Sequence, residues 1–538
     1  MIQRISSLIT VLILSISIVS AQDDITVDVT QHSESACSGV FVAHELDHIT
    51  STNADPIRMF DSNGSGLAIN DLNNDGLLDI VLANLDGEET ILWNEGDLSF
   101  RTQQIDIPVR TRQVMILDID ADGLRDLMFT SQRSAPTWWR NLGDGTFELT
   151  PLLGGNVAYA MNATDADQDG DLDFVAASYD IEMQRLDASY LLDGGAGVYY
   201  YENQDGDFVA TRLADQSQAL AVYFTDLNSD NQPEIAIGND FAELDTYWEL
   251  TDAGWESMMP FDVITHSTMS FASADVDNNG AVELYATDMH PYSEDEATVA
   301  AWQPIMDDMM AMPMIEDDPQ VMVNVLQTIE GDSYQNMSDM MGINYTGWSW
   351  SAKFGDLNSD GYVDLYVVNG MIAEDLFGHL PNNELVEENQ TFMNNGGTDF
   401  ATMPDWGLNA TASGRGMSMA DLDNDGDLDV IVNNLMSPAM LYENQLCEGN
   451  NLTLSLRDLS ANNVDAIGAQ AILTTSAGVY QRQLTAASGY LSGDANQLHF
   501  GIPDEADLLQ LEIMWSDGST TFIESLQNNT HMVITRDG

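Results

Sequence analysis

The chain has 538 residues, of which 44% are hydrophobic, so it is long enough for more than one core and is not a disordered acidic tail. Its 15 basic residues stand against 88 acidic residues, which gives a formal net charge of -73. This charge excludes nucleic acid and anionic membrane surfaces as favourable partners. A solvated acidic surface explains most of the charge, and an acidic face for cationic partners is the alternative.

Residues 1–21 resemble a secretory signal peptide. They contain Arg4, an apolar stretch from Ile5 to Val19, and the small residues Ser20 and Ala21 before Gln22. A retained membrane anchor is the alternative, although the stretch is short for a bilayer span. We therefore expect a protein that is secreted, or periplasmic or at the cell surface in a bacterium, with no membrane span after cleavage.

The chain has two cysteines, Cys37 near the start of the mature protein and Cys447 after the last acidic loop. Exported proteins meet an oxidising compartment, so we predict a Cys37–Cys447 disulfide, with two free thiols as the alternative. The bond would close a loop of about 410 residues, for which chain entropy gives a stabilisation on the order of 5 kcal/mol.

A short acidic motif recurs seven times between residues 71 and 429. The copies, numbered loops 1 to 7, are DLNNDGLLD (71–79), DIDADGLRD (118–126), DADQDGDLD (165–173), DLNSDNQPE (226–234), DVDNNGAVE (275–283), DLNSDGYVD (356–364) and DLDNDGDLD (421–429). Their starts lie 47, 47, 61, 49, 81 and 65 residues apart, a range typical of propeller blades rather than of short solenoid coils.

Oxygen atoms at loop positions 1, 3, 5 and 9, together with the carbonyl at position 7, form the ligand set that Ca²⁺ prefers, whereas Mg²⁺ keeps more of its water. The alternative is that the carboxylates only cap turns through Asx hydrogen bonds. Loops 2, 3 and 7 have four carboxylates at the four side-chain positions and are predicted to bind best. Loops 4 and 5 are predicted to bind more weakly, because Asn231 replaces the turn glycine of loop 4 and Asn279 replaces a carboxylate of loop 5.

These ions are expected to be structural, each pinning a loop to its blade. The predicted metal ligands are Asp71, Asn73, Asp75, Leu77, Asp79, Asp118, Asp120, Asp122, Leu124, Asp126, Asp165, Asp167, Asp169, Asp171, Asp173, Asp226, Asn228, Asp230, Glu234, Asp275, Asp277, Asn279, Glu283, Asp356, Asn358, Asp360, Tyr362, Asp364, Asp421, Asp423, Asp425, Asp427 and Asp429.

A short apolar run follows every loop, such as DIVLAN after loop 1, and predicts a buried strand. An EF-hand is excluded, because position 12 is apolar in all seven copies. Asn- and Gly-rich turns that end in an aromatic residue, such as 141–147, follow most runs and predict hairpins. Each repeat then forms one blade, in the order loop, inner strand, hairpin, outer strand, and seven blades close an all-β propeller.

The segment GVFVAHEL (39–46) precedes loop 1 and is expected to supply a strand to the last blade, so that the disulfide locks the closure of the ring. The same segment contains HELDH, His44 to His48, which matches the zinc-protease pattern. That chemistry needs both histidines on one face of a helix, whereas extended backbone holds them roughly 13 Å apart. A pair of strand residues is the interpretation we favour.

An insertion at about 289–346 interrupts the repeats and predicts one or two short helices on the rim, broken at Pro313 and Pro319. It is rich in methionine: Met306, Met309, Met310, Met312 and Met314. Packing of irregular apolar contacts is favoured over Cu(I) binding, because no Cys or His is interleaved. His266 and Arg415 precede two of the loops, and a ligand contact in the central channel is weighed against packing or turn roles.

Residues 449–538 predict a small β-sandwich or barrel, appended for docking, in which no catalytic constellation is visible. The domains expected are a signal peptide (1–21), the propeller (22–448) and this C-terminal domain.

The loops with their β runs resemble the FG-GAP/VCBS repeats of integrin-type propellers. Residues 347–371 and 414–434 are closer to the cartilage acidic protein family, whose propeller is followed by an ASPIC/UnbV domain. The C-terminal segments 488–492, 498–501 and 515–518 fit that domain, except that Ser516 stands where the family usually has proline. The resemblance, which covers about residues 35–536, implies a non-enzymatic extracellular binding protein.

Three functions follow from these observations. The first is a secreted, calcium-stabilised propeller that binds an extracellular protein or glycan. The second is a polysaccharide lyase or hydrolase that uses the propeller channel, which predicts a cluster of Arg, Lys, His and Tyr at the channel mouth. The third is an assembly scaffold. The scarcity of basic residues argues against the enzyme, and the sequence leaves the ligand and the oligomeric state open.

Overall fold

Seven groups of four antiparallel strands, here units 1 to 7, form a ring in the computed structural model, which describes residues 24–150, 154–186, 197–204, 206–228, 230–241, 243–311, 317–331 and 333–537. Units 3 to 7 are separate sheets, whereas units 1 and 2 belong to one ten-stranded sheet. The expected signal peptide lies outside the described residues. The first strands pack side by side around the ring, with the last against the first. The all-β propeller fold predicted from the sequence is confirmed.

Each unit has one acidic loop between its first and second strands. Units 1 to 3 are β3 (Leu67–Asn70), β4 (Asp79–Leu82), β5 (Glu89–Asn94), β6 (Phe100–Ile105); β7 (Thr111–Leu117), β8 (Asp126–Ser131), β9 (Thr137–Asn141), β10 (Phe147–Thr150); and β11 (Ala160–Thr164), β12 (Asp173–Ala177), β13 (Val198–Gln204), β14 (Asp207–Ala214). Units 4 and 5 are β15 (Ala219–Thr225), β16 (Glu234–Asn239), β17 (Thr246–Thr251), β18 (Gly254–Met258); and β20 (Phe271–Ala274), β21 (Glu283–Ala286), β24 (Val325–Glu330), β25 (Ser333–Asn336). Units 6 and 7 are β27 (Ser351–Gly355), β28 (Asp364–Val368), β31 (Gln390–Asn394), β32 (Phe400–Thr402); and β33 (Gly414–Ala420), β34 (Asp429–Asn434), β35 (Pro438–Glu443), β2 (Val42–Ile49).

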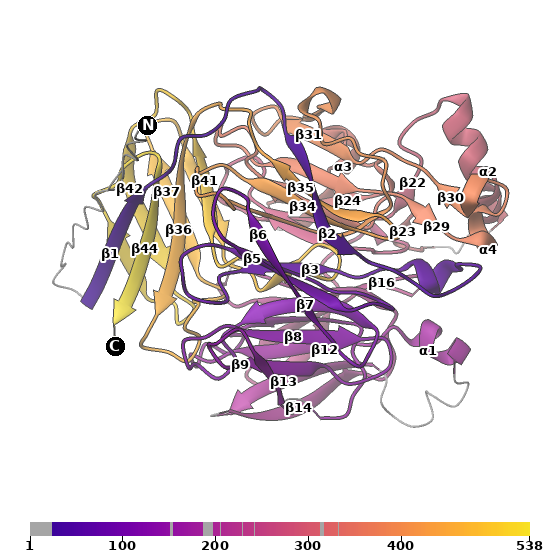
Figure 1. Cartoon of the computed structure of the whole chain (residues 1–538), viewed down its shortest axis with the longest axis horizontal. Helices are drawn as coiled ribbons and strands as arrows, with labels where there is room; N and C mark the ends of the chain where they lie inside the picture. The colour runs from indigo at the N-terminus through magenta and orange to yellow at the C-terminus, as the bar shows by residue number, and fades with distance from the viewer. Residues whose placement is uncertain are drawn as a thin grey trace, which may run out of the picture.

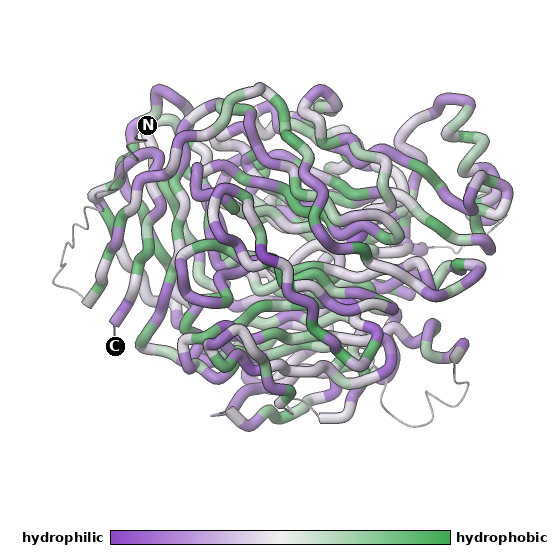
Figure 2. Tube along the Cα trace, in the orientation of Figure 1, coloured by the Kyte–Doolittle hydropathy of each residue, from purple (hydrophilic) through white to green (hydrophobic). Residues whose placement is uncertain are grey.

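The innermost strand of each unit precedes its acidic loop. The predicted blade order, in which the apolar run after the loop is the inner strand, is therefore wrong by one strand: that run is the second strand. It is nevertheless buried on both faces. In β4, Ile80 and Leu82 pack with unit 7, while Val81 and Ala83 pack with unit 2. A strand sandwiched between two neighbouring blades has no polar face, which explains the continuous apolar runs. Figure 2 shows apolar segments recurring along the strands of the ring.

Strand β2 completes unit 7 by pairing with β35, as the GVFVAHEL segment predicts. Cys37 and Cys447 form a disulfide with a Cα–Cα distance of 5.5 Å, so the predicted pairing is also confirmed. The preceding strand β1 (Asp24–Gln31) does not join the ring. It pairs with the last strand of the chain, β44 (Thr530–Asp537), so residues 24–31 belong to the C-terminal sheet although the sequence pattern assigns them to the propeller.

Short elements decorate the side of the ring opposite the C-terminal domain (Figure 1). They include α1 (Asp180–Leu186), α2 (Glu296–Ala311) and α4 (Glu374–Phe377). The chain also has the 3-10 turns η1 (Met59–Ser62), η3 (Pro381–Asn383) and η4 (Pro404–Trp406). Helix α3 (Ser338–Met341) follows β25, and paired two-residue strands are β19 (Ile264–Thr265) with β23 (Gln320–Val321), β22 (Met289–His290) with β26 (Gly347–Trp348), and β29 (Met371–Ile372) with β30 (Glu384–Leu385). Strands β24 and β25 lie within the range expected for the methionine-rich insertion but complete unit 5. Among the described residues, none of the helices has the length and apolar character needed to cross a bilayer.

The C-terminal domain is a pair of four-stranded sheets around a separate core. One sheet is β1, β44, β36 (Asn450–Asp458) and β41 (Leu498–Ile502); the other is β38 (Val479–Gln483), β37 (Gln470–Thr475), β42 (Leu508–Met514) and β43 (Thr520–Ile523). Leu452, Phe500 and Ile513 are fully buried in the core between them. This arrangement matches the sandwich alternative of the sequence prediction.

One segment of the C-terminal domain, residues 486–494, enters the propeller channel, and we call it the finger. It contains β39 (Ala487–Ser488) and β40 (Ser492–Gly493). Strand β40 inserts between the first strands of units 1 and 2, with Gly493 beside Ala68 and Ser492 beside Val114. The expectation of a merely appended domain is therefore incomplete, because the propeller and the C-terminal domain interpenetrate.

Candidate metal sites in the acidic loops

The backbone of each acidic loop curls around the carboxylate at position 1. In loop 2, for example, Asp118 accepts hydrogen bonds from the amides of Asp122 (3.1 Å) and Gly123 (2.9 Å). The same two bonds recur in loops 1, 4, 5, 6 and 7. Position 6 is left-handed throughout, including Asn231 at φ 66°, so asparagine does replace glycine there, as the sequence suggests.

The carboxylate at position 9 joins the loop to the third strand of its own unit. Asp126 accepts a hydrogen bond from the amide of Asn141, at the end of β9, over 2.7 Å. Its other oxygen accepts from the amide of Ile119 at loop position 2, over 3.4 Å. Equivalent pairs occur in loops 1, 3, 6 and 7. Position 9 therefore has a structural role even without an ion.

The asparagine that ends the third strand is a functional residue that the sequence prediction treated only as a turn residue. The Asn141 side chain donates to the carbonyl of Leu72 in the neighbouring loop 1 (2.8 Å) and to Arg125 in its own loop (2.9 Å). The residues that bridge adjacent units in this way are Asn94, Asn141, Asn394 and Asn444. A sequence signal for this role exists, because asparagine recurs at the end of the third strand in the units whose acidic loop ends in aspartate.

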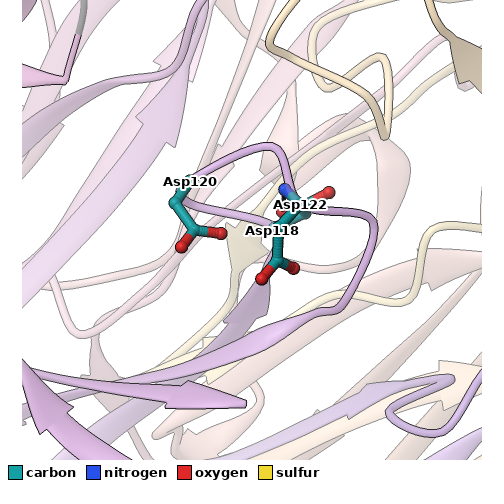
Figure 3. A group of neighbouring side chains, drawn as sticks. All are labelled: Asp118, Asp120 and Asp122. Atoms are coloured by element: carbon teal, nitrogen blue, oxygen red, sulfur yellow. Dashed lines mark hydrogen bonds between the residues drawn. The ribbon is translucent and has the colours of Figure 1, made fainter. Parts of the chain in front are cut away.

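Four loops bring three carboxylates together, with candidate ligand oxygens within 4.8 Å of one another. These groups are Asp118, Asp120 and Asp122; Asp165, Asp167 and Asp169; Asp275, Asp277 and Glu283; and Asp421, Asp423 and Asp425. Figure 3 shows the loop 2 group, with all three side chains extending from one curved loop. The three loops predicted to bind best are therefore among them, joined by loop 5, for which weaker binding was predicted.

Loops 1 and 6 have asparagine at position 3, and its amide turns to the neighbouring carboxylate. Asn73 donates to Asp75 over 2.9 Å, and Asn358 donates to Asp360 over 3.1 Å. In loop 4 the amide of Asn228 donates to Glu234 over 2.8 Å. These bonds occupy carboxylate oxygens that an ion would use, so whether these loops take an ion stays a prediction.

Burial and mutual repulsion make the loop carboxylates hard to ionise. Burial raises the pKa of Asp118 and Asp165 to about 6, and that of Asp79, Asp126 and Asp356 to about 7, with neighbouring carboxylates adding to the shift. The pKa values of Asp421 and Asp429 are likewise raised by burial and then by the other carboxylates of loop 7. A bound cation would remove this cost, since opposite charge favours the ionised form.

Loop 2 differs because an arginine already contacts its carboxylates. Arg140, on β9, lies 2.5 Å from Asp120 and 2.7 Å from Asp122. Loops 3 and 7 have no such partner among the ion pairs of the described residues. The three loops that the sequence groups together as the best sites therefore differ in their countercharge.

The C-terminal domain covers the face of the ring that carries the loops. The Gly170 carbonyl of loop 3 accepts a hydrogen bond from the Asn463 amide (2.9 Å), and the Gly426 carbonyl of loop 7 accepts one from His499 Nε2 (3.0 Å). Arg125 of loop 2 forms an ion pair with Asp465 at 2.7 Å. These contacts shield several loops from solvent.

The finger fills the channel along the innermost strands. Tyr490 is fully buried; its hydroxyl donates to the Asn63 carbonyl and lies 2.9 Å from the Tyr159 hydroxyl, and its amide donates to Ser351 Oγ. Lys353 of β27 forms an ion pair with Asp494.

Arg415 is completely buried near this segment and donates to the carbonyls of Ser62, Gly370 and Gly414. Burial lowers the pKa of Arg415 to about 9. It therefore has the packing role that the sequence weighed against a ligand contact. His266 is half-buried, and its amide donates to Asp288 over 2.8 Å.

The remaining sequence candidates do not assemble metal sites in the described part of the chain. HELDH lies on β2 as predicted, with His44 bonded to Glu443 and His48 to Thr90. Met306, Met309 and Met310 lie on α2, whereas Met312 and Met314 fall outside the described residues. The position-7 residues Leu77, Leu124 and Tyr362 contribute only a carbonyl to the predicted ligand sets.

The geometry defines a β-propeller with acidic, metal-competent loops and an interpenetrating C-terminal domain. Models of two known families match it: the FG-GAP-like repeat at residues 118–176 and 375–432, and the ASPIC and UnbV domain at residues 459–538. The chain therefore contains FG-GAP-like repeats followed by an ASPIC and UnbV domain. No curated protein matches the chain in sequence.

The chain is similar to solved structures only at low identity and low TM-score. BBS1N, crystallised in complex with ARL6DN, has a TM-score of 0.43 at 9% identity, covering 77% of this chain and 98% of that one. The Neurospora crassa Pan2 WD40 domain gives 0.41 at 8% identity, covering 76% and 97%. The Bacillus licheniformis rhamnogalacturonan lyase gives 0.37 at 10% identity, covering 76% of each. Similarity at this level says nothing about function.

Proposed function

We propose that this protein is an exported, calcium-binding β-propeller that acts as a non-enzymatic binding or adhesion module for an extracellular protein or glycan. The observation that carries the calcium proposal is the recurrence of clustered carboxylates with buried oxygens that lack partners. Asp165 is only 3% exposed and lies beside Asp167 and Asp169; its nearest donors, the Ser516 hydroxyl and the Gly170 amide, do not reach its oxygens with normal hydrogen-bond geometry. Buried anions of this kind require a cation or a proton.

Calcium fits these loops better than other ions because the donors are hard oxygens, carboxylate and carbonyl, on a flexible loop. Its proposed role is structural: an ion in each loop would neutralise carboxylates that otherwise repel one another between two blades. Loops 2, 3 and 7 are the strongest candidates, followed by loop 5. Loops 1, 4 and 6 have three carboxylates, as loop 5 does, but the amide of their position-3 asparagine already bonds one of them.

Export is supported by the Cys37–Cys447 disulfide, which suits an oxidising compartment, and by the signal-like N-terminal sequence. A binding role is supported by the FG-GAP-like repeats and by the likeness of residues 347–371 and 414–434 to the cartilage acidic protein family. The finger further favours binding over catalysis, since it occupies the channel in which the alternative lyase or hydrolase would place a polysaccharide.

Calcium is tested by chelation. Because a ligand that binds only the native state stabilises it by mass action, exhaustive EDTA treatment should lower the melting temperature by many degrees, and added Ca²⁺ should restore it. An unchanged melting temperature after metal analysis shows complete removal would reject structural calcium.

The binding role is tested with exported, calcium-loaded protein on a glycan array and in pull-downs from extracellular matrix or cell-surface extracts. Saturable binding without chemical change of the bound molecule is the expected result. Turnover of a polysaccharide by protein with intact loops would reverse the assignment in favour of the enzyme.

A further inference from the structure

Two of the seven acidic loops carry a fifth carboxylate. Position 7 is Asp171 in loop 3 and Asp427 in loop 7, whereas the other loops have Leu77, Leu124, Gln232, Ala281 and Tyr362 there. The usual contribution of position 7 to a calcium loop is its backbone carbonyl, which requires nothing of the side chain. An aspartate at this position therefore raises the question of where its carboxylate lies.

Both carboxylates are turned into their own loops rather than toward solvent. Asp171 is 6% exposed and Asp427 is 8% exposed. The Asp427 carboxylate is influenced electrostatically by Asp425, Asp429, Asp421 and Asp423, which are all the other carboxylates of loop 7. Asp171 is influenced in the same way by Asp169, Asp173 and Asp165. Asp427 lines one cavity together with Asp425, and the Asp171 amide donates to Asp169 Oδ1, so each fifth carboxyl lies beside the carboxylates of its own loop.

These buried groups lack countercharge within the described structure. One oxygen of each, Oδ1, has no hydrogen-bond partner among the described residues. None of the ion pairs formed by the described residues includes a carboxylate of loop 3 or loop 7, in contrast to loop 2 with Arg140. Two histidines pack on loop 7. His32 lies against Gly426 and uses both ring nitrogens to bond Asn451 and Thr453, and His499 uses Nε2 to bond the Gly426 carbonyl. Burial also lowers the pKa of His499 to about 3, so it is neutral.

The C-terminal domain encloses these two loops in the same way. In each, the glycine carbonyl at position 6 accepts a hydrogen bond from that domain, from Asn463 in loop 3 and from His499 in loop 7. This cover reduces contact with water, and the reduced dielectric strengthens both the repulsion among five anions and their attraction for a cation. An uncharged side chain at position 7, such as Leu124 in loop 2, adds neither to the repulsion among the carboxylates nor to their attraction for a cation.

We propose that Asp171 and Asp427 are side-chain cation ligands, and that loops 3 and 7 form a separate class of five-carboxylate site that binds Ca²⁺ first and prefers trivalent cations. This proposal rests on the cation binding proposed above. Calcium sites are tuned by the number of charged ligands, so one additional carboxylate increases affinity and favours higher cation charge. The two sites lie beneath the C-terminal domain, where their ions would also stabilise its docking.

Terbium provides a probe of loop 3 because Tyr200 donates a hydrogen bond from its hydroxyl to Asp173, at position 9 of loop 3, over 2.7 Å. Tyr362 lies in loop 6 and Tyr334 bonds loop 4 at Leu227, so the loop 3 signal is the part of the emission that Tyr200→Phe removes. Tyrosine close to a bound Tb³⁺ sensitises its emission. The test uses the full-length exported protein with Asp171→Asn, which removes the charge but keeps the carbonyl ligand. The matched control is Asp252→Asn, which removes one charge from the exposed turn between β17 and β18.

Asp171→Asn should weaken tyrosine-sensitised Tb³⁺ binding by about tenfold or more, while Asp252→Asn should bind like wild type. The melting temperature gives a second readout. Without metal, Asp171→Asn should melt higher than wild type, because a buried amide needs neither a proton nor a countercharge; with metal, it should melt lower. Asp427→Asn should show the same reversal, which keeps the test informative if one variant folds poorly.

Equal Tb³⁺ affinity for wild type and Asp171→Asn, with no reversal in either variant, would overturn this inference while leaving calcium binding by the loops intact. If wild type itself bound neither Ca²⁺ nor Tb³⁺, the proposed function would fail instead. The two failures are therefore distinguishable in the same titration.

Discussion

The ring is held together by contacts that repeat from unit to unit, whereas the C-terminal domain is attached to the ring by contacts that occur once. Neighbouring units of the ring are connected by bonds that repeat, such as the asparagine bridges of Asn94 and Asn141. The C-terminal domain is attached by contacts that occur once: the finger with Tyr490, the pairing of β1 with β44, and the Arg125–Asp465 ion pair. When one repeated contact is lost, equivalent contacts remain between the other units, whereas a contact that occurs once has no equivalent elsewhere.

Removing Tyr490 should break the attachment of the C-terminal domain most severely. Tyr490→Ala deletes a fully buried ring that packs 5.0 Å from Trp350 and hydrogen-bonds across the channel. Loss of a large buried aromatic side chain costs about 3–5 kcal/mol of unfolding free energy. Denaturant unfolding, followed separately in the two domains, measures it.

Tyr490→Phe is the control, because it keeps the ring and removes only the hydroxyl, at a cost of about 1 kcal/mol. If Tyr490→Ala unfolded at the wild-type denaturant concentration, the finger would not be an important connection between the domains.

An asparagine bridge should contribute less than the finger. Asn141→Ala leaves the carbonyls of Leu72 and Arg125 without their donor, and a buried group left unsatisfied costs about 1–3 kcal/mol. The loss should appear in the ring, because the bridge joins units 1 and 2. Asn395→Ala, on the exposed hairpin after β31, is the matched control and should be neutral. Equal stability of the two variants would contradict the bridging role.

In the metal-free protein, the carboxyl groups of the ring and those of the C-terminal domain should affect the pH dependence of stability in opposite directions. In the ring, burial raises the pKa of Asp79 and Asp126 to about 7 and of Glu283 to about 8, whereas Asp517 in the C-terminal domain has a lowered pKa owing to hydrogen bonds from Ser519 and to Arg536. A raised native pKa means that the native state holds more protons than the unfolded state between about pH 4 and pH 7–8. The stability of the native state therefore falls as pH rises through that window.

In EDTA, the melting temperature should thus be several degrees higher at pH 5 than at pH 7.5, and saturating Ca²⁺ should reduce or reverse the trend. Calorimetry at both pH values, with and without metal, measures this. A metal-free protein that became more stable as pH rose from 5 to 7.5 would show that the ring carboxylates are not the dominant titrating groups.

The repeated part of the molecule was largely predictable from sequence, because the same local requirement appears seven times. The glycine at position 6, the apolar run, and the strand at 42–49 follow from turn chemistry and burial alone. The order of strands within a blade was not predictable from those runs, because the second strand is as buried as the first. The bridging asparagines were visible as a recurrence, but their acceptor lies in another blade and has no sequence signal.

The single-copy contacts of the C-terminal domain carried less information in the sequence. Residues 488–492 contain three small residues, one tyrosine and one leucine, a composition equally compatible with a surface turn. Only the folded chain places that segment in the channel. The same holds for Arg140, which lies 14 residues after Asp126 in sequence yet contacts Asp120 and Asp122.

Arg140 offers the smallest and most local test of how countercharge differs among the loops. A cation that binds loop 2 must displace this half-exposed guanidinium from Asp120 and Asp122, two of the predicted ligands of the cation. Arg140→Gln should therefore increase Ca²⁺ affinity at loop 2 by a few-fold. The gain should be smaller at high salt, because the site is open to solvent and the ion pair is screened. Arg101→Gln removes a comparable surface charge that pairs with Glu95 and should leave Ca²⁺ binding unchanged. Calorimetric titration at two salt concentrations measures both variants. Weaker Ca²⁺ binding by Arg140→Gln would mean that the arginine holds the loop in its binding conformation rather than competing with the ion, and loop 2 would then need its arginine where loops 3 and 7 need a fifth carboxylate.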